Sequence, residues 1–202
     1  DLNMKDQRGR TPLMKATEGG HEDIVQLLLE NGAKVNAQYN DGYTALMLAA
    51  REGHKDIVKL LLERGAKTNA RCGSGWTPLM LAAEGGHEAI VKLLLAKGAD
   101  IQYTLVWAAY GSNEKIVKIL MEKGADVNEQ VMIAAESGHE AIIRLLLAKG
   151  ANINARSKNG LTPLMWAAKG SHEAIVKLLL KKGANIRLAL IGAAQGGDKK
   201  IV

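Results

Sequence analysis

Apolar and polar positions along this chain follow the period of amphipathic helices. In the segment Glu88–Lys97, apolar residues recur at spacings of three and four, namely Ile90, Val91, Leu94 and Leu95. This pattern predicts a helix with one apolar face that must pack against a neighbouring element.

A shorter helix is predicted immediately before this segment. Thr77 is a favourable N-cap, and Pro78 suits the first helical position because a backbone N–H would have no partner there. The glycine pair Gly85-Gly86 is expected to end this helix after about two turns. The polar, glycine-rich segment Asn69–Trp76 that precedes it predicts a turn or a projecting hairpin. The predicted unit is therefore hairpin, short helix, amphipathic helix.

The same unit returns along the whole chain. A Gly-Ala pair follows the second helix of each unit, with successive steps of 33, 33, 26, 26 and 33 residues. A repeat of this length predicts a solenoid, in which stacked neighbours bury the apolar faces that one unit cannot bury alone. The glycines of these pairs are Gly32, Gly65, Gly98, Gly124, Gly150 and Gly183.

Three units depart from the pattern. Those whose first helices contain Trp107, Met132 and Ile191 lack about seven residues and the Thr-Pro start, so we expect them to have no hairpin. Asn128 is expected to cap the second of them, with Glu129 placed against the positive end of the helix. Nothing comparable is found near residues 103 and 188, so we predict the poorest helix starts and the easiest local opening there.

The pattern x-Gly-x-Thr-Pro-Leu-x-x-Ala-Ala, followed by Gly-His, Ile-Val-x-Leu-Leu-Leu and Gly-Ala-x-x-Asn, resembles the ankyrin repeat. It is almost complete in the units beginning at Thr11, Thr44, Thr77 and Thr162, with Ala45 replacing proline in the second. The resemblance implies an all-α ankyrin-repeat solenoid of about seven stacked helix-turn-helix units, with β-hairpin fingers missing in three.

The resemblance also implies a domain organisation. We expect residues 1–202 to form a single array, and the lack of polar capping units at its ends leads us to expect an excerpt of a longer one. The approximate unit boundaries are 5–37, 38–70, 71–102, 103–128, 129–155, 156–187 and, incomplete, 188–202.

Composition excludes several other classes of protein. Apolar residues make up 47% and charged residues 24%, which is typical of a folded soluble domain. Apolar runs such as Ala45–Ala50 are far shorter than the roughly 20 residues that cross a bilayer, so no membrane span or signal segment is expected. Cys72 is the only cysteine. No internal disulfide can form, which favours a cytoplasmic or other reducing intracellular compartment.

The histidines are not expected to form a metal or catalytic site. Each belongs to a different unit, and stacked helices lie roughly 8–10 Å apart, whereas zinc needs ligand atoms within about 2 Å. The His-Glu pairs also lack a second histidine one turn later. We therefore expect a structural capping role, no cofactor and no enzymatic activity. The histidines are His21, His54, His87, His139 and His172.

Charge is distributed unevenly. Most basic residues of the second helices have a glutamate four residues earlier, which favours ion pairs within the helix. Residues 144–202 contain eleven Lys or Arg against two acidic residues, a net +9, whereas residues 1–143 contain sixteen against nineteen, a net −3. This excess can attract an acidic partner to the C-terminal end. Nucleic acid is the less favoured acidic partner, because Trp166 is the only aromatic residue available there for base stacking.

The resemblance implies that a partner contacts the hairpin tips and the exposed sides of the first helices, which line a concave face. Tyr43 and Trp76 are the first candidates, because exposed aromatic residues with arginine neighbours commonly anchor interfaces. The alternative is that each ring lies flat against the neighbouring hairpin and covers backbone. The predicted partner-binding residues are Arg10, Tyr43, Arg51, Trp76, Glu84, Tyr110, Lys158, Leu161 and Lys169.

Other conspicuous side chains are expected to be structural. Trp107 and Trp166 occupy a first-helix position held elsewhere by leucine, which favours packing between units. Cys72, in a predicted hairpin, is expected to be an exposed thiol. A row of methionines in the first helices is also assigned to packing, namely Met14, Met47, Met80 and Met165.

The favoured function is therefore a non-enzymatic scaffold that binds another protein or a peptide on its concave face. A second hypothesis is an engineered or purely structural array, which the near-identical units favour. A third is binding of a polyanion or nucleic acid by the basic C-terminal units, which would weaken steeply with salt. The missing hairpins predict a notch around residues 100–135 that divides the binding surface into an aromatic N-terminal part and a basic C-terminal part.

Overall fold

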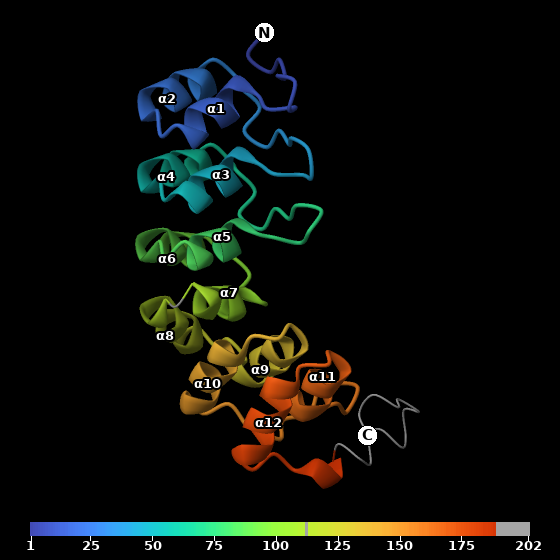
Figure 1. The fold of residues 1–202 in the computed structure, drawn as a ribbon. Helices are drawn as coiled ribbons and strands as arrows, with labels where there is room; N and C mark the ends of the chain where they lie inside the picture. The colour runs from blue at the N-terminus through green and yellow to red at the C-terminus, as the bar shows by residue number, and fades with distance from the viewer. Residues whose placement is uncertain (112, 189–202) are drawn as a thin grey trace. The chain divides into compact units, whose positions relative to one another are not determined.

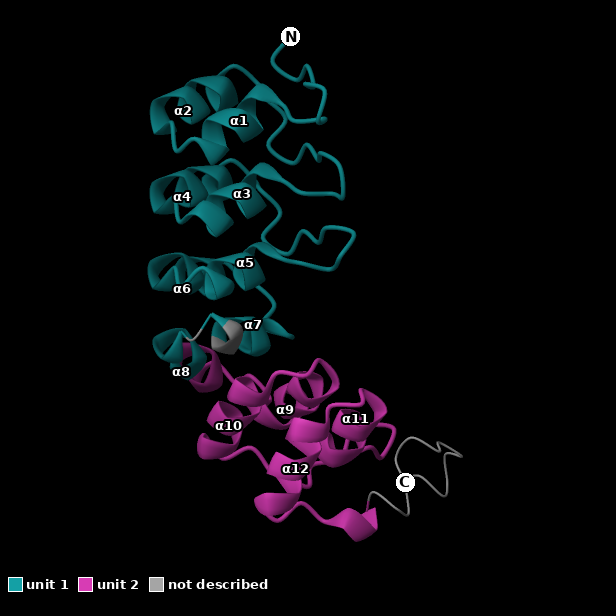
Figure 2. Cartoon of the chain, viewed as in Figure 1, with its two compact units in different colours: residues 1–118 teal, residues 119–202 magenta. Residues whose placement is uncertain are grey.

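The computed structural model describes residues 1–111 and 113–188, so the first helix expected around Ile191 lies outside the described residues. The chain forms two compact units, residues 1–118 (unit 1) and residues 119–202 (unit 2), shown in Figure 2. Helix α8 (Glu114–Glu122) contains the boundary between them.

Unit 1 is built from pairs of short antiparallel helices. Helices α1, α3, α5 and α7 are the first helices of successive repeats, and α2, α4 and α6 are second helices. Within each kind, neighbours pack side by side along the unit (Figure 1). Their bounds are α1 Pro12–Glu18, α2 Glu22–Glu30, α3 Ala45–Glu52, α4 Lys55–Glu63, α5 Pro78–Glu84, α6 Glu88–Ala96 and α7 Thr104–Tyr110.

Each complete first helix begins at the predicted threonine. In α3, the Thr44 hydroxyl accepts a hydrogen bond from the Met47 backbone N–H at 3.3 Å, and Thr77 and Met80 do the same in α5 at 3.2 Å. The predicted row of methionines is buried in the core, as packing requires. The sequence rules for where these helices begin are confirmed.

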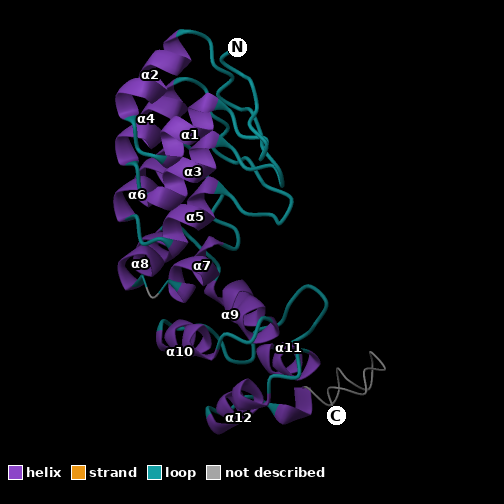
Figure 3. Cartoon of the chain, turned by 45° about the horizontal axis from the view of Figure 1, so that its top comes forward, coloured by secondary structure: helices purple, strands orange, loops and turns teal. Residues whose placement is uncertain are grey.

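The segments between repeats of unit 1 project from the same side of the first helices, as Figure 3 shows for the loops that lead into α3 and α5. Within residues 1–111 and 113–188, these segments form tight turns and no regular strand. An isolated antiparallel bridge joins Tyr39 to Tyr43. The Cys72 N–H similarly donates to the Trp76 carbonyl at 3.1 Å. The hairpin that was expected to be missing before α7 is absent, since only a short connection separates Gly98 from the start of α7.

Unit 2 repeats the same architecture. Helix α9 (Val127–Glu136) packs against α10 (Glu140–Ala148), and α11 (Pro163–Lys169) packs against α12 (Glu173–Lys181). The two first helices, α9 and α11, also pack against each other. A short connection leads from Gly124 into α9, and a hairpin precedes α11, where the Ser157 N–H donates to the Leu161 carbonyl at 2.9 Å. This distribution of hairpins is the predicted one.

Two expectations about helix starts were wrong. Asp126, and not Asn128, caps α9, because its carboxylate accepts the N–H groups of Asn128 at 2.8 Å and Glu129 at 3.3 Å. Near residue 188 a cap is also present, since the Asn185 side chain accepts from the Arg187 N–H at 3.0 Å. The start of α7 is less regular, as expected, because Tyr103 lies in the left-handed region with φ 61°.

Candidate functional site

The predicted capping histidines have a different role in the structure. Their side chains make no hydrogen bond to the start of the helix they precede. Instead, the imidazole Nε2 of three of them, His54, His87 and His172, lies near a backbone carbonyl of the preceding repeat, so Nε2 must carry a proton and donate. The distances are 3.3 Å from His54 to the Glu18 carbonyl, 2.9 Å from His87 to that of Arg51, and 2.9 Å from His172 to that of Glu136.

The position that holds these histidines also accepts a second type of hydrogen-bond donor. In one repeat of unit 1, Asn113 replaces histidine, and its amide donates to the Ala83 carbonyl at 2.9 Å. The slot therefore needs a hydrogen-bond donor, which asparagine supplies as well as imidazole. Among the described residues, no group of three or more His, Cys, Asp or Glu side chains is placed to hold a metal ion.

Asparagines form a second set of bonds between repeats, which sequence reasoning had not assigned. The Asn69 side chain accepts from the Asp100 N–H at 2.8 Å and donates to the Gly98 carbonyl at 3.0 Å. Asn36 makes the same pair of bonds to Lys67 and Gly65. The pattern Gly-Ala-x-x-Asn, which recurs from repeat to repeat, was the signal in the sequence that could have indicated this role. Histidine and asparagine bonds together hold consecutive repeats of unit 1 in register.

The first predicted site residues lie in an ion-pair network on unit 1. Arg10 bonds Glu18 at 2.7 Å, and the other oxygen of Glu18 lies 3.6 Å from Arg51. Arg10 also pairs with Asp6 at 3.3 Å. The backbone N–H of Arg10 bonds the Asp6 carboxylate and is the main reason that the pKa of Asp6 falls to about 2. The structure thus brings Arg10 and Arg51 together through Glu18.

Tyr43 and Trp76 surround a small apolar cluster. Both rings pack against buried Met47, Cys72 and Leu81, and both rings remain half-buried. Burial raises the pKa of the Tyr43 hydroxyl above its ordinary value. Both residues thus cover buried side chains at the hairpins and remain partly accessible, and their contact with a partner stays a prediction.

Trp76 also contacts the next repeat. Its ring centroid lies 4.1 Å from that of Trp107 in α7, with the planes inclined by 39°. This contact confirms that Trp107 packs between repeats. It also fixes the orientation of Trp76, because the ring is held by Trp107 as well as by the cluster beneath it.

Cys72 is buried, which corrects the expectation of an exposed thiol. Only 5% of the residue is accessible, because Tyr43 and Trp76 cover it together with Met47 and Leu81. Its Sγ lies 3.4 Å from the Ser74 hydroxyl. The hairpin backbone is polar, but this side chain points inward.

We predict that native Cys72 reacts with an aromatic disulfide reagent at least about 100-fold more slowly than in denaturant, because reaction requires local opening. The rate is measured by absorbance at mildly alkaline pH. The control is Ser74→Cys in a Cys72→Ala background, since Ser74 is exposed two residues away. Equal rates for the two native proteins would contradict the burial of Cys72.

The remaining predicted site residues are separate from this group or incompletely described. Glu84 ends α5 in unit 1 and is half-buried, whereas Tyr110 ends α7 with a side chain outside the described part of the structure. In unit 2, Leu161 is half-buried and Lys158 is exposed on the hairpin before α11. Lys169 lies over the Trp166 ring, with Nζ 5.2 Å from the centroid, which is a cation–π geometry.

Stacked helix pairs, joined by repeated side-chain bonds between neighbouring repeats, define each unit as a helical repeat solenoid. The family model "Ankyrin repeats (3 copies)" matches residues 1–72, 67–131 and 105–189. The chain therefore belongs to the ankyrin repeat family. Ankyrin repeats generally serve as scaffolds for protein–protein interaction, and proteins built from them are typically non-enzymatic.

Two curated viral proteins are similar over a short segment. "Ankyrin repeat domain-containing protein OPG015" of Monkeypox virus is 50% identical over 42 residues, which is 21% of this chain and 10% of that protein. "Ankyrin repeat protein 14" of Vaccinia virus (strain Western Reserve) is 48% identical over 42 residues, 21% of this chain and 18% of that protein. These two similarities support the family and say nothing about a partner.

None of the helices within residues 1–111 and 113–188 is long and apolar enough to span a bilayer.

Proposed function

We propose that this chain is a non-enzymatic recognition scaffold that binds a protein partner on one surface of unit 1. We call this surface the hairpin face. It is formed by the hairpins and the ends of the first helices, and its residues are Arg10, Tyr43, Arg51, Trp76 and Glu84.

One observation carries the proposal: the aromatic residues of the hairpin face, Tyr43 and Trp76, pack on a buried apolar cluster while both remain partly accessible. The Met47–Cys72–Leu81 cluster supports both rings, and Trp107 supports Trp76 further. Rigid aromatic side chains bind with little loss of conformational entropy, so they are effective anchors of protein interfaces.

The charges beside these rings support the same use. Arg51 lies between Glu18 and Glu52, with its Nε 2.8 Å from the Glu52 carboxylate, and remains partly accessible. An arginine already held by carboxylates presents its remaining donors in a fixed direction, which favours selective contact with a partner. The hairpin face therefore combines aromatic area with oriented polar groups.

The surface of unit 2 is a separate part of the proposal. The short connections before α7 and α9 lack hairpins, which supports a recognition surface divided into an aromatic N-terminal part and a basic C-terminal part. Lys158, Leu161 and Lys169 belong to the C-terminal part, and their contact with a partner is a proposal that rests on their position in the repeat.

The proposal is tested by affinity capture from a cell lysate with quantitative mass spectrometry. Tyr43→Leu combined with Trp76→Leu should reduce capture of the specific partner at least about tenfold, because anchor residues dominate interface energy. Leucine is chosen because Leu161 occupies the same repeat position, so the repeat accommodates it. The thermal unfolding of each variant is measured alongside.

The matched control is Lys59→Ala combined with Lys92→Ala, on the exposed sides of α4 and α6. Full capture is expected for this control. Capture that survives the leucine variants and is lost in the control would place the partner on the second helices and overturn the proposal. Equal capture by the unchanged chain, the double leucine variant and the double alanine control would also overturn it.

A further inference from the structure

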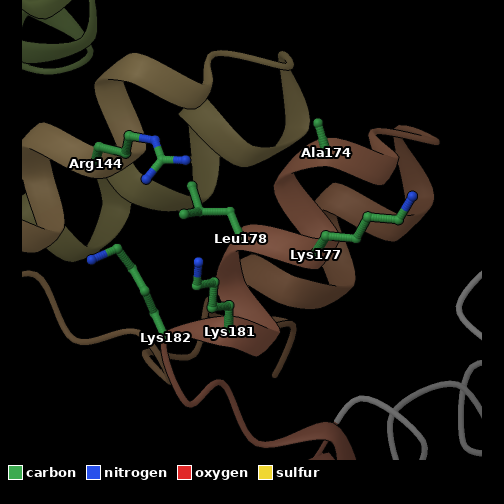
Figure 4. A pocket seen from close by; sticks show the side chains of 6 residues that line it. All are labelled: Arg144, Ala174, Lys177, Leu178, Lys181 and Lys182. Carbon is green, nitrogen blue, oxygen red and sulfur yellow. The ribbon is translucent and has the colours of Figure 1, made fainter.

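A hollow of about 520 Å³ lies in unit 2, beside α10 and α12, away from the hairpins. Figure 4 shows its lining, in which the nitrogen ends of Arg144 and Lys181 lie on either side of the Leu178 side chain and Lys182 extends to the left, away from Leu178. Lys177 extends in another direction in this view. The complete lining is Arg144, Ala174, Lys177, Leu178, Lys181 and Lys182, so four of six residues are cationic and none is acidic.

The charge of this hollow comes from a departure within the repeat. Lys181 is the last residue of α12, and the last residues of the preceding second helices are glutamate or alanine. In unit 1, one residue in this position neutralises a cation of the next repeat, since Glu30 of α2 lies 3.7 Å from Arg64 at the end of α4. The equivalent residues are Glu30, Glu63, Ala96, Glu122 and Ala148. Lysine at this position adds a positive charge where the preceding second helices have a negative charge or none.

The cations of the hollow differ in how they are compensated. Arg144 bonds Glu140 at 2.6 Å, and Lys177 lies 3.6 Å from Glu173. Within the described residues, Lys181 and Lys182 have no ion-pair partner. The carbonyl end of α12 favours cations at this point, but the helix dipole supplies only about half a negative charge. An anion in the hollow would therefore relieve repulsion between neighbouring cations.

The lining also indicates which kind of anion fits. Nucleic acid binding without sequence preference relies on aromatic side chains on which bases stack. No residue of this lining is aromatic. The volume falls within the range of pockets that hold a small ligand or a few side chains. Ala174, Leu178 and the lysine methylenes supply apolar contact beside the charges.

We infer that this hollow is a second binding site, which takes a short acidic segment of a protein partner. Carboxylates of the segment would bond Lys181, Lys182 and the free donors of Arg144. The site lies on second helices of unit 2, so it does not depend on the hairpin face of unit 1.

The test measures fluorescence polarisation of a labelled glutamate-rich peptide of about eight residues at about 50 mM NaCl, where screening is weak. The full chain should bind this peptide, and Lys181→Glu should weaken binding about tenfold by replacing an attraction with a repulsion. This variant restores the residue type of Glu30, Glu63 and Glu122, so thermal unfolding should be unchanged.

The matched control is Arg156→Glu, which makes the same change of net charge on an exposed residue of unit 2 that lies outside the hollow and is not among the predicted partner-binding residues. It should change the affinity by less than about twofold. Equal weakening by Arg156→Glu and Lys181→Glu, or equal binding of the peptide with glutamine in place of glutamate, would overturn the inference. Tighter binding of an oligouridylate of equal charge would assign the site to nucleic acid instead.

Discussion

Replacing Ile57 with alanine is expected to lower the free energy of unfolding by about 3 kcal/mol, because it opens a cavity in a fully packed interior. Ile57 lies on α4, which packs against α2, α3 and α6, and is 2% exposed. A solenoid depends on such contacts because no other core holds its repeats together. Urea unfolding followed by circular dichroism measures the loss.

Ile24 provides a matched comparison, because it occupies the same position in α2 but is 49% exposed. Ile24→Ala removes the same atoms as Ile57→Ala and makes the same change in helix propensity. Much of the Ile24 side chain, however, already contacts water. We expect a loss of about 1 kcal/mol or less. Equal losses for the two variants would contradict the conclusion that packing between repeats is the main source of stability.

The helices could be predicted from the sequence because their determinants are local. Thr44 and Thr77 reach N–H groups three residues away, and the glycines act through their own backbone. The apolar period of each second helix likewise needs only the repeat itself. The start and end of each helix are therefore determined by residues that are close in the sequence.

Features that depend on another repeat were harder to predict. Cys72 lies in a polar segment, and the equivalent positions hold Asp6, Tyr39 and Ser157, so no shared chemistry marks the position as buried. It is buried because Met47 of the preceding repeat packs against it. The periodic pattern therefore predicted the position of the hairpin correctly and the exposure of the Cys72 side chain wrongly.

The prediction of the residue that caps α9 was wrong for a related reason. Asn128 is a good N-cap by propensity, but its side chain accepts the Asn152 N–H of the next repeat at 2.7 Å. Asp126 remains available and caps the helix instead. The same competition explains the histidines, whose imidazoles bond carbonyls of the preceding repeat. In these cases the polar side chain forms a hydrogen bond to a neighbouring repeat and does not cap its own helix.

Replacing Gly53 with alanine is expected to destabilise unit 1 by about 2–3 kcal/mol, for two separable reasons. Gly53 ends α3 in the left-handed region, with φ 83°, where an alanine side chain is strained. The added Cβ would also lie 2.6 Å from Cε1 of His87. The imidazole must then move, and its bond to the Arg51 carbonyl is weakened. Urea unfolding measures the combined loss.

Gly65→Ala separates the two causes. Gly65 has φ 84°, but a Cβ there would meet nothing within 4 Å, so this variant should lose only the backbone contribution of about 1–2 kcal/mol. In a His87→Ala background, Gly53→Ala should cost no more than Gly65→Ala, giving a coupling energy of about 1 kcal/mol between Gly53 and His87. If the two glycine variants lose the same stability while His87 is intact, the imidazole bond between repeats contributes nothing measurable.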